Sequence, residues 1–195
     1  WSVMGIAAVL VLTGVPYPAY FSGAQFIHFL LGPAVVALGW PLWQRRTALR
    51  QQWSRLVLCA LAGGATAAGS ALLLAWAMGL PADVMLSLAP KSVTAPVAMG
   101  IAEKIGGVPA LAAVFAVLSG LVGALSGKYL FTLLRLPDST AGWQARGFAL
   151  GTASHGIGAA RAMQVNADAG AYAGLALGLQ VVLAAVLMPL LFRLF

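Results

Sequence analysis

Long apolar segments dominate this chain and most constrain what it can fold into. Only 8% of the 195 residues are charged and 62% are hydrophobic, whereas soluble domains carry about 25% charged residues. A water-soluble core cannot bury this much apolar surface. Because backbone polar groups need internal partners in lipid, we predict an all-α, polytopic membrane protein with residues 1–195 as a single integral-membrane domain.

Two polar interruptions lie inside segments that otherwise have the composition of membrane helices. The first is APKSVTAP at residues 89–96, and the second is GTASHGIG at residues 151–158. Unwound backbone is tolerated at membrane depth only where it is buried in protein or lines a cavity. Paired interruptions in corresponding places indicate the binding site of a transporter. The expected helix-breaking residues are Pro90, Pro96, Gly151, Gly156 and Gly158.

The net charge of +7 comes from 11 Lys and Arg against 4 Asp and Glu. The cations are scattered between apolar runs rather than arrayed on one polar face, which argues against a nucleic-acid partner. They are better interpreted as topology signals. The strongest signal is residues 44–55, which hold Arg45, Arg46, Arg50 and Arg55 without an acid, and we place this stretch in the cytoplasm.

The apolar runs predict an order of membrane elements. Residues 1–13 are short for a span and open at Trp1 without Met, so we expect native N-terminal residues to precede them. We expect spans at 25–43, 56–78, 109–134 and 169–192, interrupted segments at 82–105 and 142–165, and loops at 14–23 and 135–143. Three small-residue patterns predict close helix packing: Gly123/Gly127, Gly147/Gly151 and Gly170/Gly174/Gly178.

Each interrupted segment is long enough to cross the membrane with a kink or to enter and return. If residues 82–105 crossed, Lys128 and Arg135 would lie outside, against the positive-inside rule. If they return, both cations lie inside, and the second segment enters from the opposite face. An inverted repeat requires that arrangement. We therefore favour two inverted, re-entrant hairpins that meet near the middle of the bilayer.

The first interruption has the chemistry of an anion site. Pro96 suits the first turn of a helix, with Ser92 or Thr94 as its cap. The N-terminus of such a helix carries partial positive charge, and Lys91 adds a full one. The alternative is that Lys91 snorkels to an interface.

The second interruption offers donors and acceptors in Thr152, Ser154 and His155, followed by Arg161, whose guanidinium can clasp a carboxylate. Ser154 and His155 are adjacent, but no Gly-x-Ser-x-Gly turn is present and no acid is placed to orient the histidine. We therefore predict no enzyme activity. His155 either couples transport to protons or serves as a static hydrogen-bond donor, and both readings stay open.

The remaining polar residues have structural interpretations. Asp83 and Asp168 suit helix caps, and Asp138 suits a solvated loop. Glu103 and Lys104 suit a surface pair, and His28 suits an interfacial position. Cys59 is expected to be a packed, inert thiol. We predict no cofactor and no metal site. The coupling ion, a proton or sodium, is left open.

Two long motifs resemble the signature of the LrgB/CidB family: residues 90–99, followed by Gly106–Gly107, and residues 146–161. The turn at 13–17 and the last span match in pattern, so the resemblance covers essentially the whole chain. One departure is Gln164, where many relatives carry a glutamate.

The resemblance implies a multi-pass protein of the bacterial inner membrane, partnered by a small LrgA/CidA-type membrane protein. It implies an antiholin-like role in controlling murein hydrolase activity and autolysis. Pyruvate uptake systems and the plastid glycolate/glycerate transporter are related. We therefore expect a secondary transporter or facilitator of small monocarboxylates, and a homo-oligomer. The alternative is a non-transporting partner that oligomerises with the LrgA/CidA-type protein to regulate lysis. The expected substrate-binding residues are Lys91, Ser92, Thr94, Thr152, Ser154, His155 and Arg161.

Overall fold

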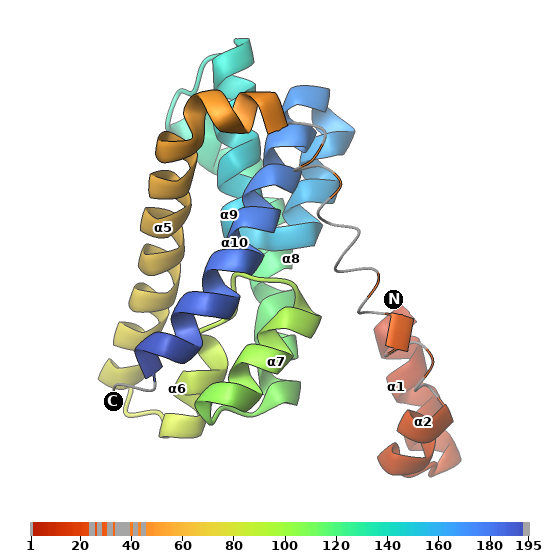
Figure 1. The fold of residues 1–195 in the computed structure, drawn as a ribbon. Helices are drawn as coiled ribbons and strands as arrows, with labels where there is room; N and C mark the ends of the chain where they lie inside the picture. Colours follow the sequence, from red (N-terminus) through yellow and green to blue (C-terminus); the bar gives the residue numbers. More distant parts are fainter. Residues whose placement is uncertain are drawn as a thin grey trace. The chain divides into compact units, whose positions relative to one another are not determined.

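A computed structural model describes residues 2–23, 26, 29–30, 33, 40, 43 and 46–192. The chain divides into two compact units, residues 1–37 and 38–195. The first unit contains α1 (Ser2–Thr13) and α2 (Tyr17–Gly23) (Figure 1). The predicted loop at 14–23 is therefore wrong from Tyr17 onward, because the Pro16 carbonyl accepts N–H hydrogen bonds from Ala19 and Tyr20 and a short helix begins there. His28 and most of the predicted span at 25–43 lie outside the described residues.

The described part of the second unit consists of helices joined by short turns and loops. Its elements are α5 (Arg46–Ala77), α6 (Ala82–Leu88), α7 (Ala95–Ile105), α8 (Pro109–Leu133), α9 (Thr140–Val165) and α10 (Ala167–Phe192). Among the described residues, 3 helices are long and apolar enough to cross a membrane: Arg50–Ala77, Pro109–Leu133 and Ala167–Phe192. They confirm the predicted spans at 56–78, 109–134 and 169–192.

Residues 46–55 of the basic stretch form the first turns of α5. The helix bends at Gln52 (φ −123°, ψ 17°), between its basic first turns and its apolar remainder (Figure 1). Arginine is a good helix former, so the helix continues beyond its apolar part rather than ending there.

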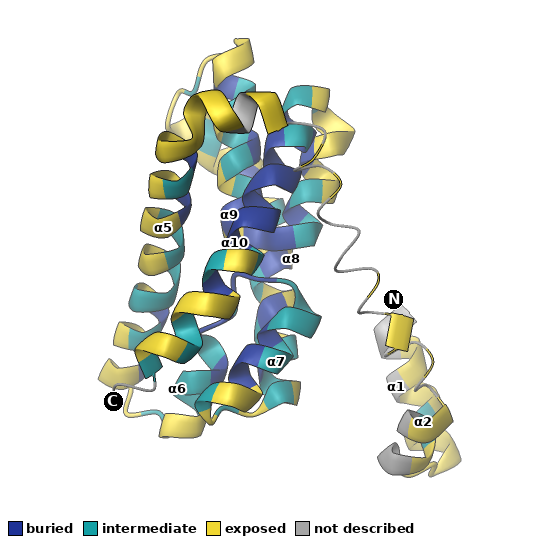
Figure 2. Ribbon diagram, in the orientation of Figure 1, coloured by how far each residue is buried: buried dark blue, intermediate teal, exposed yellow. Residues whose placement is uncertain are grey.

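The outer face of α5 is apolar and exposed (Figure 2). Leu73 is 67% exposed and Trp76 is 72% exposed, which suits contact with lipid. Cys59 is also exposed, so the prediction of a packed thiol is wrong. The buried residues concentrate on α9 and α10, at the centre of the unit (Figure 2).

Small residues bring α9 and α10 into close contact. Side chains on Gly147 and Gly151 would collide with the backbone carbonyls of Ala169 and Ala173 in α10. The predicted packing role of the Gly147/Gly151 pattern is therefore confirmed. Gly170 packs against the backbone of Met163 and is buried, as are Gly174 and Gly178.

α9 begins earlier than its predicted start at residue 142. Ser139 caps the helix, because its Oγ accepts the Gly142 N–H at 3.2 Å. The predicted loop at 135–143 therefore ends at Ser139 and Trp143 is helical. Asp138 remains in the loop, 79% exposed, and pairs with Arg146 at 2.8 Å.

Candidate functional site: two helix breaks that meet

The first break is residues 89–94, between α6 and α7, and it lies within the predicted interruption. Thr94 is the N-cap residue of α7, and Pro96 lies in the first turn, as predicted. The Thr94 side chain makes no capping hydrogen bond. The first N–H groups of α7 therefore have no side-chain cap from Thr94, the position where an anion or a cap usually binds.

The first break and α7 together form an excursion of the chain, residues 88–107, whose two ends are joined through Ser87. Ser87 is fully buried. Its Oγ accepts the Val108 N–H at 2.7 Å and donates to the Asp83 carbonyl at 2.6 Å. The segment that follows Ser87 therefore returns to Ser87 at Val108, just before α8 begins. The returning helix, α7, has 11 residues, or about 16 Å at 1.5 Å per residue. That is about half of the 30 Å hydrocarbon thickness of a bilayer.

The second break is a single residue, His155, with φ 41° and ψ −132°. On either side, residues 140–154 and 156–165 pack against each other: a side chain on Gly158 would lie 2.6 Å from the Leu150 carbonyl oxygen. Trp143 and Leu150 on the first arm share a cluster with Ala162 on the second. Gly151, Gly156 and Gly158 were expected to unwind the segment. They are helical instead, and the departure from helix is confined to His155.

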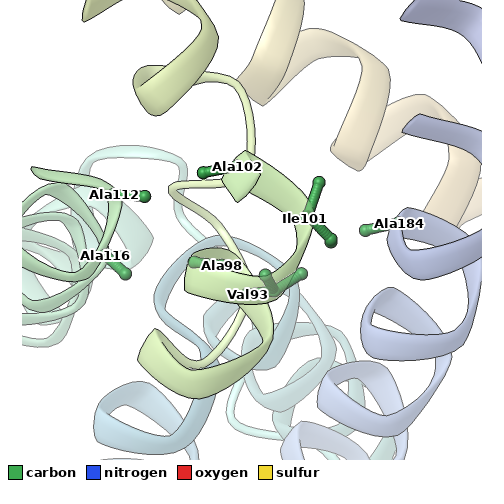
Figure 3. Close-up of a cluster of buried hydrophobic side chains, with 7 residues drawn as sticks. All are labelled: Val93, Ala98, Ile101, Ala102, Ala112, Ala116 and Ala184. Atoms are coloured by element: carbon green, nitrogen blue, oxygen red, sulfur yellow. The ribbon is translucent and has the colours of Figure 1, made fainter. Parts of the chain in front are cut away.

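The two breaks meet at one turn of α8. His155 Nε2 lies 2.7 Å from the Ala116 carbonyl oxygen, which can only accept, so Nε2 donates. Ala116 also packs in one cluster with Val93 and Ala98, at the start of α7 (Figure 3). Gly120, one turn along α8, leaves room for the imidazole, because a Cβ there would lie 2.7 Å from Nε2.

Several polar groups near the breaks are buried. The hydroxyls of Thr94, Thr152 and Ser154 are buried and find no hydrogen-bond partner within the described part of the chain. Thr152 faces Gly63 of α5, and Ser154 faces Gly123 of α8. An unpaired buried hydroxyl costs about 1–3 kcal/mol. Ser92 is buried and Lys91 is half-buried in the first break.

Arg161 is not brought to the two breaks. It is exposed on the second arm of α9 and lines a cavity of about 1320 Å³ together with Lys128, Arg135 and Arg146. The other six predicted substrate-binding residues do not line this cavity. The structure thus separates Arg161 from Lys91 and the hydroxyls.

Gln180 is a buried polar residue that sequence reasoning missed. It is 4% exposed in α10, and its Nε2 donates to the Ala60 carbonyl of α5 at 2.6 Å. The available signal was a glutamine in the middle of an apolar span, since such polar groups hydrogen-bond between membrane helices.

The chain was compared with known proteins. The model of the LrgB-like family matches residues 1–194. The chain is 35% identical to the uncharacterized Bacillus subtilis protein YxaC, over 97% of this chain and 81% of that protein. It is 32% identical to an uncharacterized Haemophilus influenzae protein, over 99% of this chain and 82% of that one. It is 31% identical to the holin-like protein CidB of Staphylococcus aureus, over 98% of this chain and 82% of CidB. No solved structure matches the chain.

Proposed function

The chain belongs to the LrgB-like family and is a bacterial membrane protein, and we propose that it is a secondary transporter or facilitator of small monocarboxylates such as glycolate, glycerate or pyruvate. The observation that carries the proposal is the meeting of two helix breaks at Ala116, beside buried hydroxyls that have no partner among the described residues. Buried polar groups are nearly always hydrogen-bonded, so these hydroxyls favour a polar ligand.

The topology that we propose is a pair of facing re-entrant hairpins. The joined ends of the first excursion at Ser87 and Val108, and the packing of the two α9 arms, support it. Charge supports it as well. The first residues of α5 and α10 and the last residues of α8 lie at the same end of the second unit (Figure 1). The cations Arg46, Arg50, Arg55, Lys128 and Arg135 belong to that end. The positive-inside rule then places it in the cytoplasm.

In the proposed site, the substrate carboxylate binds at the N-terminus of α7. The free N–H groups there and the positive end of the helix dipole favour an anion. Lys91 supplies the full charge. Ser92 and the hydroxyls of Thr94, Thr152 and Ser154 offer hydrogen bonds to the carboxylate and to a substrate hydroxyl.

His155 is a positioning residue in this proposal. Its hydrogen bond to Ala116 ties the second break to α8, where the first break also packs. A static donor role explains this bond without proton coupling. Arg161 lies outside the proposed site, in the separate cavity.

Uptake by proteoliposomes tests the proposal. The full chain is reconstituted and offered glycolate, glycerate, lactate and pyruvate, with and without sodium and at two pH values. We expect saturable uptake of one acid and its loss in Lys91→Ala. Lys104→Ala is the matched control, because Lys104 is exposed in the last turn of α7 and should leave uptake unchanged. Wild-type uptake in Lys91→Ala would overturn the proposed site.

A second candidate is the non-transporting, antiholin-like partner of an LrgA/CidA-type protein; the relative CidB is named a holin-like protein. The glycines Gly170, Gly174 and Gly178, expected to form the assembly face, are buried within this fold. The groove between α5 and α10 is the better face, since its α5 wall carries small residues, including Gly64, Ala68 and Gly69. Loss of lysis control in Gly69→Leu, with no uptake in any variant, would favour this candidate.

A further inference from the structure

The cavity of about 1320 Å³ between α8 and α9 has two chemically different parts. Lys128, Arg135 and Arg161 make one part basic. Leu121 and Leu125 make the other part apolar. No residue of the proposed substrate site lines it. The cavity is therefore separate from that site.

Three of the cations that line the cavity have no ion-pair partner in the part of the chain that the structure describes. Arg146, the fourth cation of the lining, pairs with Asp138 at 2.8 Å. No ion pair to Lys128, Arg135 or Arg161 is found among the described residues. All three are exposed, and they lie where α8 and the second arm of α9 end. Tyr129, 77% exposed beside Lys128, suits the headgroup level, where amphipathic rings collect.

In the proposed topology, the apolar wall continues from the basic part toward the middle of the membrane. Leu125 and Leu121 lie one and two turns before Lys128 on the same face of α8. Leu125 is 73% exposed. A ligand that fills the cavity thus needs negative charge at the interface and hydrocarbon below it.

We propose that this cavity binds one anionic phospholipid. Its phosphate lies among Lys128, Arg135 and Arg161, and an acyl chain lies along Leu121 and Leu125. Basic pockets between membrane helices on the cytoplasmic side bind such headgroups. A free phosphate would leave the apolar wall exposed. The helix of a second copy would bury three unpaired cations, which is costly.

Competition between lipids tests the proposal. The purified full chain is exchanged from detergent into mixtures of phosphatidylglycerol and phosphatidylcholine, and bound lipid is counted by native mass spectrometry. We expect a preference for phosphatidylglycerol. Each of Lys128→Gln and Arg161→Gln should lower that preference about fivefold, the effect of one cation near a membrane surface. Arg50→Gln is the matched control: Arg50 is exposed in the first turns of α5 and does not line the cavity, so its loss should change nothing.

Further measurements distinguish a bound lipid from free phosphate and from a second copy of the chain. Millimolar inorganic phosphate should not displace the lipid, and Leu125→Asn should lower the retention of both lipids. Four results would each overturn the proposal: equal retention of the two lipids, an equal loss in Arg50→Gln, displacement by inorganic phosphate, or a dimer closed across the cavity without bound lipid. Unchanged elution of each variant on size exclusion shows that it is folded.

Discussion

The two helix breaks reach the same turn of α8 by different means. The first break takes up six residues, 89–94, none of which belongs to a helix. Pro90 lies within it and Pro96 follows it. The second uses one residue, His155, and keeps helical backbone on both sides. The first break follows from local sequence, because proline lacks an N–H and is disfavoured in a helix interior, as at Pro90, but suits a first turn, as at Pro96.

The second break depends on its neighbours instead. A non-glycine residue at positive φ with extended ψ costs about 1–3 kcal/mol, and it persists only where the surroundings hold it. Here the bond to Ala116 and the glycine contacts of the two arms with α10 and with each other hold it. A polar hairpin in a membrane can thus be fixed either by its own residues or by the helices around it.

Filling a glycine contact should break the second hairpin most severely. Gly151→Ala would drive a methyl group into the Ala173 carbonyl, and overpacking against backbone should lower the free energy of unfolding by more than about 3 kcal/mol. Gly156→Ala is the matched control on the same helix, because no atom lies within 4 Å of the added carbon. It should be neutral or stabilising by up to about 1 kcal/mol. Unfolding in mixed micelles measures both, and equal losses would show that these glycines do not hold the hairpin.

The first hairpin should be most sensitive at its closed end. Ser87→Ala removes the acceptor of the Val108 N–H and leaves this buried donor unpaired, which should cost about 1–3 kcal/mol. Ser126→Ala, at an exposed position on α8, should change stability by less than about 0.5 kcal/mol. Native-state hydrogen exchange should show α7 opening earlier in Ser87→Ala. Unchanged exchange in α7 would mean that Ser87 does not close the excursion.

Residues with strong local effects were the predictable ones. Pro90 and Pro96 fixed the first break, and the apolar runs fixed the spans that became α5, α8 and α10. The second break lies within the predicted interruption at residues 151–158, but its position at His155 could not be predicted, because Gly151 and Gly158, which suggest unwinding, serve close packing instead. His155 departs from helix through a contact with Ala116, 39 positions away in the chain.

The candidate site was predictable in kind but not in arrangement. Hydroxyls within apolar runs indicated polar groups in the membrane, and the hydroxyls of Thr94, Thr152 and Ser154 are buried. Arg161 follows His155 by six positions, yet it lies in the cavity between α8 and α9 because the chain reverses at His155. Sequence spacing predicts proximity only along an unbroken helix.

The strained backbone of His155 gives the finest test of how the second break is held. His155→Ala removes the hydrogen bond to Ala116 and keeps the positive φ, whereas His155→Gly removes the same bond and relieves the strain. The glycine variant should therefore be more stable than the alanine variant by about 1 kcal/mol. At Ala153, an exposed helical position two residues earlier, the order should reverse, and Ala153→Gly should lose about 0.5–1 kcal/mol. If alanine were the better residue at both positions, residue 155 would be helical in the folded protein. The second break would then have to lie at a glycine, as local sequence first suggested.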